Sequence, residues 1–223
     1  MSMNPNMNPA PSRTMVRRSK KRSRRKSLLK KWLITGILAA ALIAAGVYYL
    51  TWHQTQMQYA QYPLRYEELI VAHAEAFDLE PWHVAAVIRC ESSFRETATS
   101  NVGARGLMQL MPDTGAWIAG KFDEEDVYTD DSLYTPELNI KYGCWFLQWL
   151  MTRYDGDRTL VTAAYHAGHG TVDKWLADPE ISPDGKTLPE IPYESTRLYV
   201  GRVLKACEKY QELYDFSGND SGN

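Results

Sequence analysis

The sequence predicts a mainly α-helical domain preceded by a single N-terminal transmembrane helix. Apolar residues recur at steps of three or four over most of residues 63–214, which is the spacing of an amphipathic helix. No segment alternates apolar and polar residues for long enough to be a convincing strand. Residues 32–50 form a run of nineteen residues without a charge, and the 223-residue chain has room for one ordinary domain besides.

Residues 1–31 are predicted to be a basic, disordered cytoplasmic tail. They begin with an Asn- and Pro-rich stretch that lacks an apolar period. Residues 1–51 carry eleven Lys and Arg and no acid, and the first acid of the chain is Glu67. A basic run is also typical of a nucleic-acid patch, but its position directly ahead of the apolar run favours a membrane flank. No nucleic-acid partner is therefore expected.

Residues 32–51 are predicted to cross a membrane once, because a run of this length spans a hydrocarbon core. Lys and Arg beside a span stay on the cytoplasmic side, so the N-terminus is expected inside and the residues after about Thr51 outside. A cleaved signal peptide is the alternative, but its apolar stretch is shorter. Aromatic residues suited to the two membrane interfaces flank the run: Trp32, Tyr48, Tyr49 and Trp52.

Residues 52–62 are polar and are predicted to form a short stalk or a helical extension. The folded domain is expected over residues 63–214, and residues 215–223 are expected to be a disordered tail. Proline stands near several predicted helix starts, where its fixed φ is favourable. Helices are predicted near residues 69–77, over 81–94, from 112, and over 136–153, 157–165 and 192–214. Loops are predicted at 95–105, 122–135 and 177–191.

Three cysteines lie in the predicted domain: Cys90, Cys144 and Cys207. None has the close Cys or His spacing of a zinc site, so neither a metal nor a cofactor is expected. All three lie in apolar helical contexts, which favours buried free thiols. A single disulfide stays open as the alternative, because the domain is predicted to lie outside the cytoplasm.

The densest unusual stretch of the sequence begins at Glu91. ESSF covers residues 91–94 and GARGLMQLMP covers 103–112, followed by AYHAG at 164–168 and PYESTRLYV at 192–200. In order and spacing these segments resemble the soluble lytic transglycosylase family, whose lysozyme-like fold is related to goose-type lysozyme. The resemblance covers about residues 63–214.

The resemblance implies a peptidoglycan lytic transglycosylase. Such an enzyme cleaves the β-1,4 bond between MurNAc and GlcNAc without water and leaves a 1,6-anhydroMurNAc end. Glu91 matches the family Glu, which acts first as acid and then as base. A Glu at the end of an apolar helix is also a place where desolvation can raise its pKa. Tyr199 matches a family tyrosine whose hydroxyl approaches this carboxyl, and it is the second expected catalytic residue.

By the same resemblance, five residues are expected to line the sugar-binding cleft: Ser100, Met108, Gln109, Tyr165 and His166. Gln109 is expected to hydrogen-bond a sugar and Met108 to offer an apolar platform, whereas Met111 is expected in the core. A helical aromatic such as Tyr165 is as typical of a core as of a cleft.

Two positions depart from the family pattern. His166 stands where the family commonly has Asn, and a role in binding is expected rather than one in proton transfer. Ser195 stands where the last motif often has Glu. Glu194 comes one residue earlier, which turns its side chain by about 100° around a helix, so it does not inherit that position.

Two alternatives to the lytic transglycosylase remain at this stage. A muramidase-type hydrolase would need a water-positioning group, and no acid is assigned to that role. A wall-binding module without turnover would not need Glu91 and Tyr199 together. The sequence leaves open whether a partner in the cell-envelope machinery recruits the protein.

Overall fold

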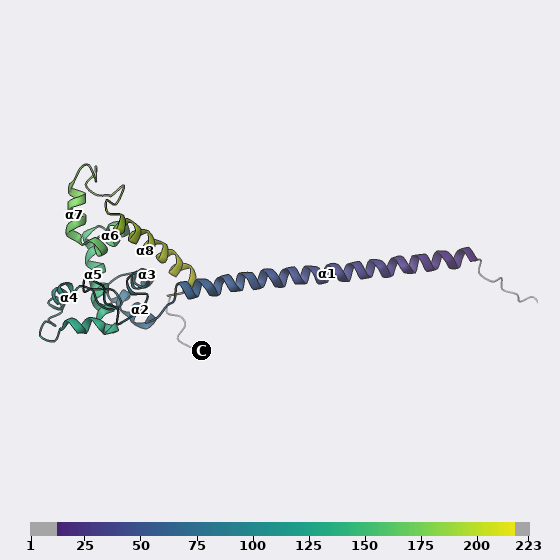
Figure 1. Ribbon diagram of the computed structural model, residues 1–223, viewed down its shortest axis with the longest axis horizontal. Coiled ribbons are helices and arrows are strands. Elements are labelled where there is room, and N and C mark those ends of the chain that lie inside the picture. Colours follow the sequence, from purple (N-terminus) through teal and green to yellow (C-terminus); the bar gives the residue numbers. More distant parts are fainter. Residues whose placement is uncertain (1–12, 217–223) are drawn as a thin grey trace, which may run out of the picture. The chain divides into compact units, whose positions relative to one another are not determined.

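The computed structural model describes residues 13–216, and this range is mainly α-helical, as predicted. It contains no β-strand. Its β-type pairing consists of isolated antiparallel bridges of Arg105 with Thr99 and with Leu110. The helices are α1 (Arg13–Gln61), α2 (Glu67–Ala76), α3 (Pro81–Ser92), α4 (Pro112–Ala119), the 3₁₀ helix η1 (Asp130–Tyr134), α5 (Pro136–Arg153), α6 (Arg158–Ala167), α7 (His169–Ala177) and α8 (Glu194–Leu213) (Figure 1).

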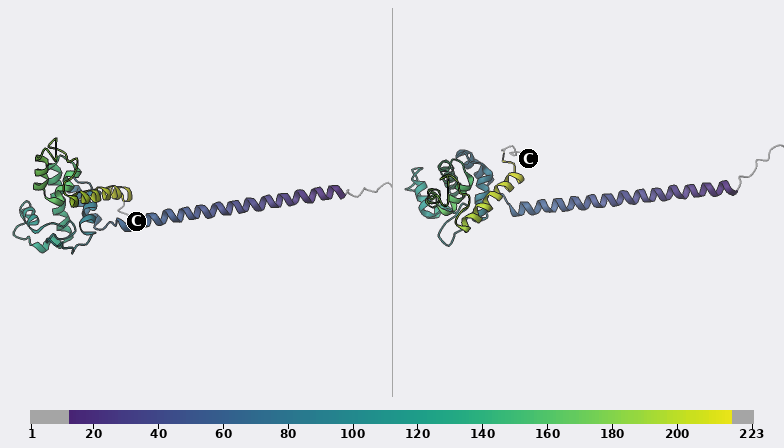
Figure 2. Two further views of the ribbon diagram at one scale, coloured as in Figure 1. Left: turned by 45° about the horizontal axis from the view of Figure 1, so that its top comes forward. Right: turned by 90° about the horizontal axis from the view of Figure 1, so that it is seen from above.

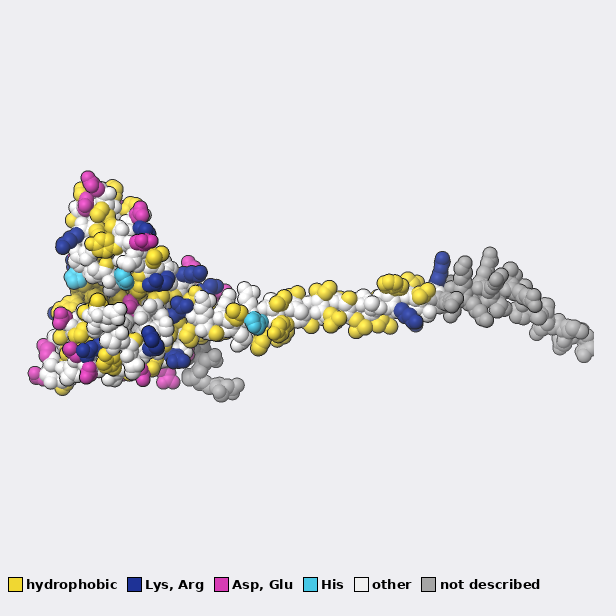
Figure 3. Space-filling view, viewed as in Figure 1, with side chains coloured by type: hydrophobic (Ala, Val, Ile, Leu, Met, Phe, Trp, Pro, Cys, Tyr) yellow, Lys and Arg dark blue, Asp and Glu magenta, His cyan; other side chains and the backbone are white. Residues whose placement is uncertain are grey.

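The chain divides into two compact units, Met1–Gln58 and Tyr59–Asn223. Helix α1 accounts for the described part of the first unit. Its segment Arg25–Gln61 is long and apolar enough to cross a membrane. In Figure 3 hydrophobic side chains cover its middle, and Lys and Arg side chains lie nearer its N-terminal part.

The structure differs from the sequence prediction at the N-terminal end of this unit. Residues 13–31 are helical rather than disordered, and residues 1–12 of the predicted tail lie outside the described residues. Helix α1 also continues unbroken through most of residues 52–62, which corresponds to the helical extension that was one of the two alternatives for this segment. A segment rich in Lys and Arg can form a helix, because both residues have a high helix propensity.

Proline sets the starts of three helices of the second unit. Helices α3, α4 and α5 begin at Pro81, Pro112 and Pro136, as predicted, because a proline in the first turn costs no intrahelical hydrogen bond. Two elements lie in segments where no helix was predicted: η1 and α7.

The core of the second unit is built around α3. All residues from Trp82 to Ile88 are buried, and α3 packs against α2 and most extensively against α8. Helix α8 is the yellow helix in both views of Figure 2. Helix α5 contacts α2, α4 and η1 at one end of the domain and α6 at the other (Figure 1).

The loop between α3 and α4 is held by one buried amide. Asn139 on α5 is fully buried, and its Nδ2 donates to the carbonyl oxygens of Arg105 (3.1 Å) and Leu133 (2.7 Å). Its Oδ1 accepts a hydrogen bond from Met108 N at 2.7 Å. Gly106 has a φ of +79°, and a Cβ there would lie 2.1 Å from Leu133 O and 2.3 Å from Asn139 Nδ2. Only a glycine therefore lets the loop approach this amide.

We expect Asn139→Asp to destabilise the protein by about 2 to 4 kcal/mol. A carboxylate cannot donate, so two buried carbonyl oxygens would lose their partner and face a buried negative charge. Urea unfolding of the full chain in detergent micelles measures the change. Asn101→Asp, at an exposed position of the same loop, is the control. Equal midpoints for the two variants would contradict this account of the loop.

Candidate active site

Glu91 lies in the last turn of α3, at the point where the helix is forced to end. Ser93 and Phe94 follow with left-handed φ values of 53° and 61°. Neither residue is glycine, so this turn is maintained at a conformational cost by its surroundings. Phe94 supplies part of that support, because its side chain is 1 % exposed and lies in the core. The partly buried Glu91 carboxyl is thereby fixed at the end of a rigid helix.

The hydroxyl of Tyr199 on α8 donates a hydrogen bond to Glu91 Oε1. Burial raises the pKa of Glu91 to about 7, and this outweighs the opposing effects of the Tyr199 hydrogen bond and the Arg202 charge. Burial and the neighbouring Glu91 charge raise the pKa of Tyr199 well above its usual range, so its hydroxyl stays a donor. Near neutral pH the carboxyl can thus both give and take a proton.

A histidine and an arginine complete the surroundings of Tyr199. The His166 ring stacks on the Tyr199 ring with 4.6 Å between centroids, and its Nδ1 lies 3.1 Å from Thr196 Oγ1. The Arg202 guanidinium lies 5.9 Å from the Tyr199 ring centroid. Burial, and then the Arg202 charge, lower the pKa of His166. Arg202 was not among the predicted site residues, although it follows Tyr199 by three positions, which places both on one face of α8.

Tyr165 joins the helical part of the site to the glycine-containing loop. Its hydroxyl donates to Met108 O at 2.8 Å. The Met108 side chain is fully buried, so the predicted apolar platform for a sugar is not exposed in this structure. Gly143 on α5 provides the space, because a Cβ there would lie 2.1 Å from Met108 Sδ. Met108 therefore contributes its backbone carbonyl to the site and its side chain to the core.

Met111 differs from its prediction in the opposite direction, because it is more exposed than expected. It was predicted in the core, but it is 40 % exposed at the start of α4. Burial of Met108 depends on the position of Gly143, more than thirty residues further along the chain. Local sequence contains no signal for that choice.

Two predicted sugar ligands have their polar groups engaged within the loop. Gln109 Nε2 donates to Ala98 O (3.1 Å) and Gly106 O (3.0 Å), which leaves its carbonyl oxygen as the group to accept from a ligand. Ser100 Oγ accepts from Ala104 N at 3.0 Å. The contacts of the described residues do not join either side chain to Glu91, so their sugar-binding roles stay predictions.

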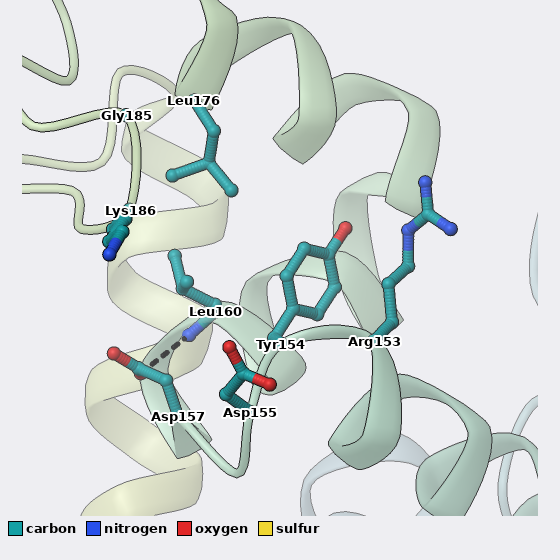
Figure 4. A pocket seen from close by; sticks show the side chains of 8 residues that line it. All are labelled: Arg153, Tyr154, Asp155, Asp157, Leu160, Leu176, Gly185 and Lys186. Carbon is teal, nitrogen blue, oxygen red and sulfur yellow. Dashed lines mark hydrogen bonds between the residues drawn. The ribbon is translucent and has the colours of Figure 1, made fainter.

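The pocket in Figure 4 lies apart from these residues. It has a volume of about 350 Å³ and lies near the start of α6, whereas Tyr165 and His166 are near the end of that helix. Its lining residues are Arg153, Tyr154, Asp155, Asp157, Leu160, Leu176, Gly185 and Lys186. None of the predicted site residues is among them.

The residues of the last motif that depart from the family pattern, and the three cysteines, lie outside the contacts around Glu91 that are described above. Ser195 and Glu194 are both exposed at the start of α8. Cys144 and Cys207 are buried, Cys90 is partly buried, and all three are free thiols.

The fold and the site together define a helical domain in which a desolvated carboxyl lies at the end of a helix and accepts a hydrogen bond from a tyrosine hydroxyl. Comparison with known proteins gives the family: the transglycosylase SLT domain matches residues 68–186, and the chain belongs to this family.

The similar proteins include soluble and membrane-bound lytic murein transglycosylases. A soluble lytic murein transglycosylase from Salmonella typhimurium is 34 % identical over 154 residues, which are 69 % of this chain and 24 % of the relative. A membrane-bound lytic murein transglycosylase C from Actinobacillus pleuropneumoniae is 31 % identical over 67 % of this chain and 46 % of its own length.

The similar solved structures are also lytic transglycosylases. The 70 kDa soluble lytic transglycosylase from Escherichia coli aligns with a TM-score of 0.62 and 29 % identity over 70 % of this chain and 25 % of that chain. An inactive mutant of lytic transglycosylase Slt from Pseudomonas aeruginosa aligns with a TM-score of 0.59 and 33 % identity over 68 % of this chain and 25 % of that chain. The chain thus spans about a quarter of the length of the first curated relatives that it matches.

We expect Glu91→Gln to stabilise the fold at alkaline pH. Because the folded pKa is about 7 and the ordinary value is 4.5, ionising Glu91 costs more in the folded state than in the unfolded state. This cost grows as the pH rises from 4.5 to 7 and is constant above, where it reaches about 3 kcal/mol. The neutral Gln removes the cost and can still accept the Tyr199 hydrogen bond.

Thermal unfolding of the full chain in detergent micelles at pH 5 and pH 8 measures this effect. The melting temperature of Glu91→Gln should exceed that of the parent protein at pH 8, and the difference should shrink toward pH 5. Glu208→Gln, on an exposed part of α8, should behave like the parent at both pH values. A Glu91→Gln effect that does not depend on pH would rule out a desolvated carboxyl.

Proposed function

We propose that this chain is a membrane-anchored lytic transglycosylase. It cleaves the β-1,4 bond between MurNAc and GlcNAc of peptidoglycan without water and leaves a 1,6-anhydroMurNAc end. Its similarity to soluble and membrane-bound lytic murein transglycosylases supports murein cleavage. The observation that carries the proposal is the Glu91 carboxyl, whose pKa of about 7 suits both giving and taking a proton.

Glu91 does both proton transfers in the proposed reaction. The protonated carboxyl gives its proton to the glycosidic oxygen, the bond from this oxygen to C1 of MurNAc breaks, and positive charge develops at C1. The Glu91 carboxylate then accepts the proton of the C6 hydroxyl as the C6 oxygen bonds to C1. Glu91 ends protonated, ready for another cycle, and the acetamido group of the substrate can stabilise C1 in the interval.

Tyr199 and Arg202 support the charged intermediate state of Glu91. The hydroxyl hydrogen bond and the guanidinium charge both favour the carboxylate that exists between the two proton transfers. Glycosidases that hydrolyse their substrate commonly use a second carboxylate as base or nucleophile. The groups that act on Glu91 here are a guanidinium and a phenol whose pKa is raised well above its usual range, and neither is a carboxylate.

Helix α1 is proposed to anchor the enzyme in the cell membrane as a single pass. Its length and apolar composition support a span, and the charged side chains described at its start are basic: Arg25, Lys26, Lys30 and Lys31. This bias favours a cytoplasmic N-terminus and an extracytoplasmic catalytic domain, on the side where peptidoglycan lies. A relative named as membrane-bound agrees with an anchored enzyme.

Muropeptide analysis tests the proposed function. The full chain in detergent micelles should release fragments ending in 1,6-anhydroMurNAc from purified peptidoglycan, as mass spectrometry would show. Glu91→Gln should release none, and Glu208→Gln should match the parent. Fragments with reducing MurNAc ends would identify a hydrolase, and no release by the parent chain would favour a binding module.

The pH dependence of cleavage tests the role of Tyr199. Because Glu91 must be protonated in the first step, kcat/KM should fall as the pH rises through about 7. Tyr199→Phe removes a hydrogen bond that lowers the Glu91 pKa, so this descending limb should shift to higher pH while kcat falls roughly tenfold or more.

Tyr210→Phe is the matched control for that experiment. Tyr210 is another buried tyrosine of α8, but its hydroxyl donates to Pro63 O at 2.7 Å, away from Glu91. Its loss should leave the limb in place. A Tyr199→Phe profile that keeps the parental limb would show that the hydroxyl does not act on the catalytic proton.

A further inference from the structure

A group of aromatic rings next to the candidate site is not used by the proposed chemistry. Trp117 on α4 lies against two indoles of α5, with ring centroids 5.1 Å from Trp145 and 5.4 Å from Trp149. Phe146 stacks on Trp149 at 6.0 Å and 11°, and His169 at the start of α7 meets Trp149 edge-on at 5.0 Å. We call these five residues the aromatic shelf.

The shelf is more exposed than an aromatic core. Trp117 is 39 % exposed, His169 is exposed, and the three rings of α5 are only partly buried. By contrast, the aromatic side chains that serve as core in this domain, such as Tyr142 and Tyr210, are fully buried. Exposed aromatic surface of this kind is typical of a binding site.

The shelf is continuous with the candidate active site. The Phe146 ring centroid lies 5.5 Å from that of Tyr165, whose hydroxyl binds Met108 O and whose pKa the charge of Glu91 helps to raise. Tyr165 therefore stands between the catalytic carboxyl and the shelf.

The chemistry of the shelf fits sugar rings that carry anionic substituents. The C–H faces of β-linked pyranoses are flat and apolar, so they can stack on indole rings. Cations border the indoles: Lys121 Nζ lies 5.7 Å from the Trp117 ring, and the Arg153 guanidinium lies 5.5 Å from the Trp149 ring. Arg153 also pairs with Asp173. Residues 52–223 carry 27 acids and only fourteen Lys and Arg, so two cations beside the indoles distinguish this surface from an otherwise acidic domain.

We propose that the aromatic shelf binds the sugar rings of the glycan strand beyond the bond that is cleaved, with Trp117 as its exposed stacking platform. This inference rests on the proposed function, because the occupant is the strand held at Glu91. The shelf makes the enzyme selective for long strands, since a short oligosaccharide fills only the site at Glu91.

Binding to strands of different length tests the shelf without cleavage. The full chain carrying Glu91→Gln, in detergent micelles, is titrated calorimetrically with long peptide-free glycan strands and with a short MurNAc–GlcNAc oligosaccharide. Adding Trp117→Ala should weaken binding of the long strands roughly three- to tenfold and leave binding of the short oligosaccharide unchanged. Trp117→Phe keeps a ring and should restore most of the loss.

Val127→Ala is the matched control, because Val127 is 76 % exposed but lies in the 122–135 loop, outside the shelf. Thermal unfolding shows whether Trp117→Ala only loosens α4. If it does, His169→Ala, at the exposed far end of the shelf, replaces it and should show the same dependence on strand length. Equal affinity of parent and shelf variants for long strands, or equal losses for short and long ligands, would overturn the inference.

The outcomes separate this inference from the proposed function. If the parent chain leaves reducing ends, or does not cleave at all, the lytic mechanism fails, while the length-dependent binding still decides the shelf. If the parent chain leaves 1,6-anhydroMurNAc ends but the shelf variants bind all lengths like the parent, only the shelf fails.

Discussion

The site depends on one hydrogen bond, from the Tyr199 hydroxyl to the Glu91 carboxyl, which joins α3 to α8. A carboxyl taken out of water resists ionisation, and a donor pointed at it favours ionisation, so their balance sets the pKa of about 7. The balance requires two helices far apart in sequence to stay in register. The buried face of α3 and the apolar stripe of α8 provide this, because the two helices share the largest contact in the domain. The core and the acid–base chemistry are thus properties of the same packing.

The loop between α3 and α4 depends on a different device. Its close approach to α5 needs two positions without a side chain, Gly106 beside Asn139 and Gly143 beside Met108. Once Asn139 has fixed the loop, Met108 O is in place to accept the Tyr165 hydroxyl. The glycine-containing loop therefore contributes to the candidate site through its backbone. The Met108 carbonyl binds the Tyr165 hydroxyl, whereas the side chains of Ser100 and Gln109 bind the backbone of the loop itself.

Sequence reasoning predicts the parts of this structure that depend on local chemistry. Prolines place the starts of three helices, and the position of Glu91 at the end of an apolar helix follows from the periodicity of α3. Helix α7 is missed because Gly168 and Gly170 look like breakers, although Gly168 with its φ of 84° caps the preceding helix. The burial of Met108 is not predictable from local sequence, because the space for its side chain is provided by Gly143 on another helix. Arg202 is missed because the recognised motif ends before it.

The replacement of the usual family Asn by His166 is compatible with this chemistry because of its surroundings. Burial and the Arg202 charge lower the pKa of His166, and both therefore favour the neutral imidazole beside Tyr199. A charged imidazole stacked on Tyr199 would instead favour the Glu91 carboxylate and lower the pKa on which the first step depends. The neutral ring still offers one donor and one acceptor, as an amide does, and Thr196 already binds its Nδ1. Arg202 therefore has two effects: it favours the catalytic carboxylate directly, and it helps to keep the neighbouring histidine uncharged.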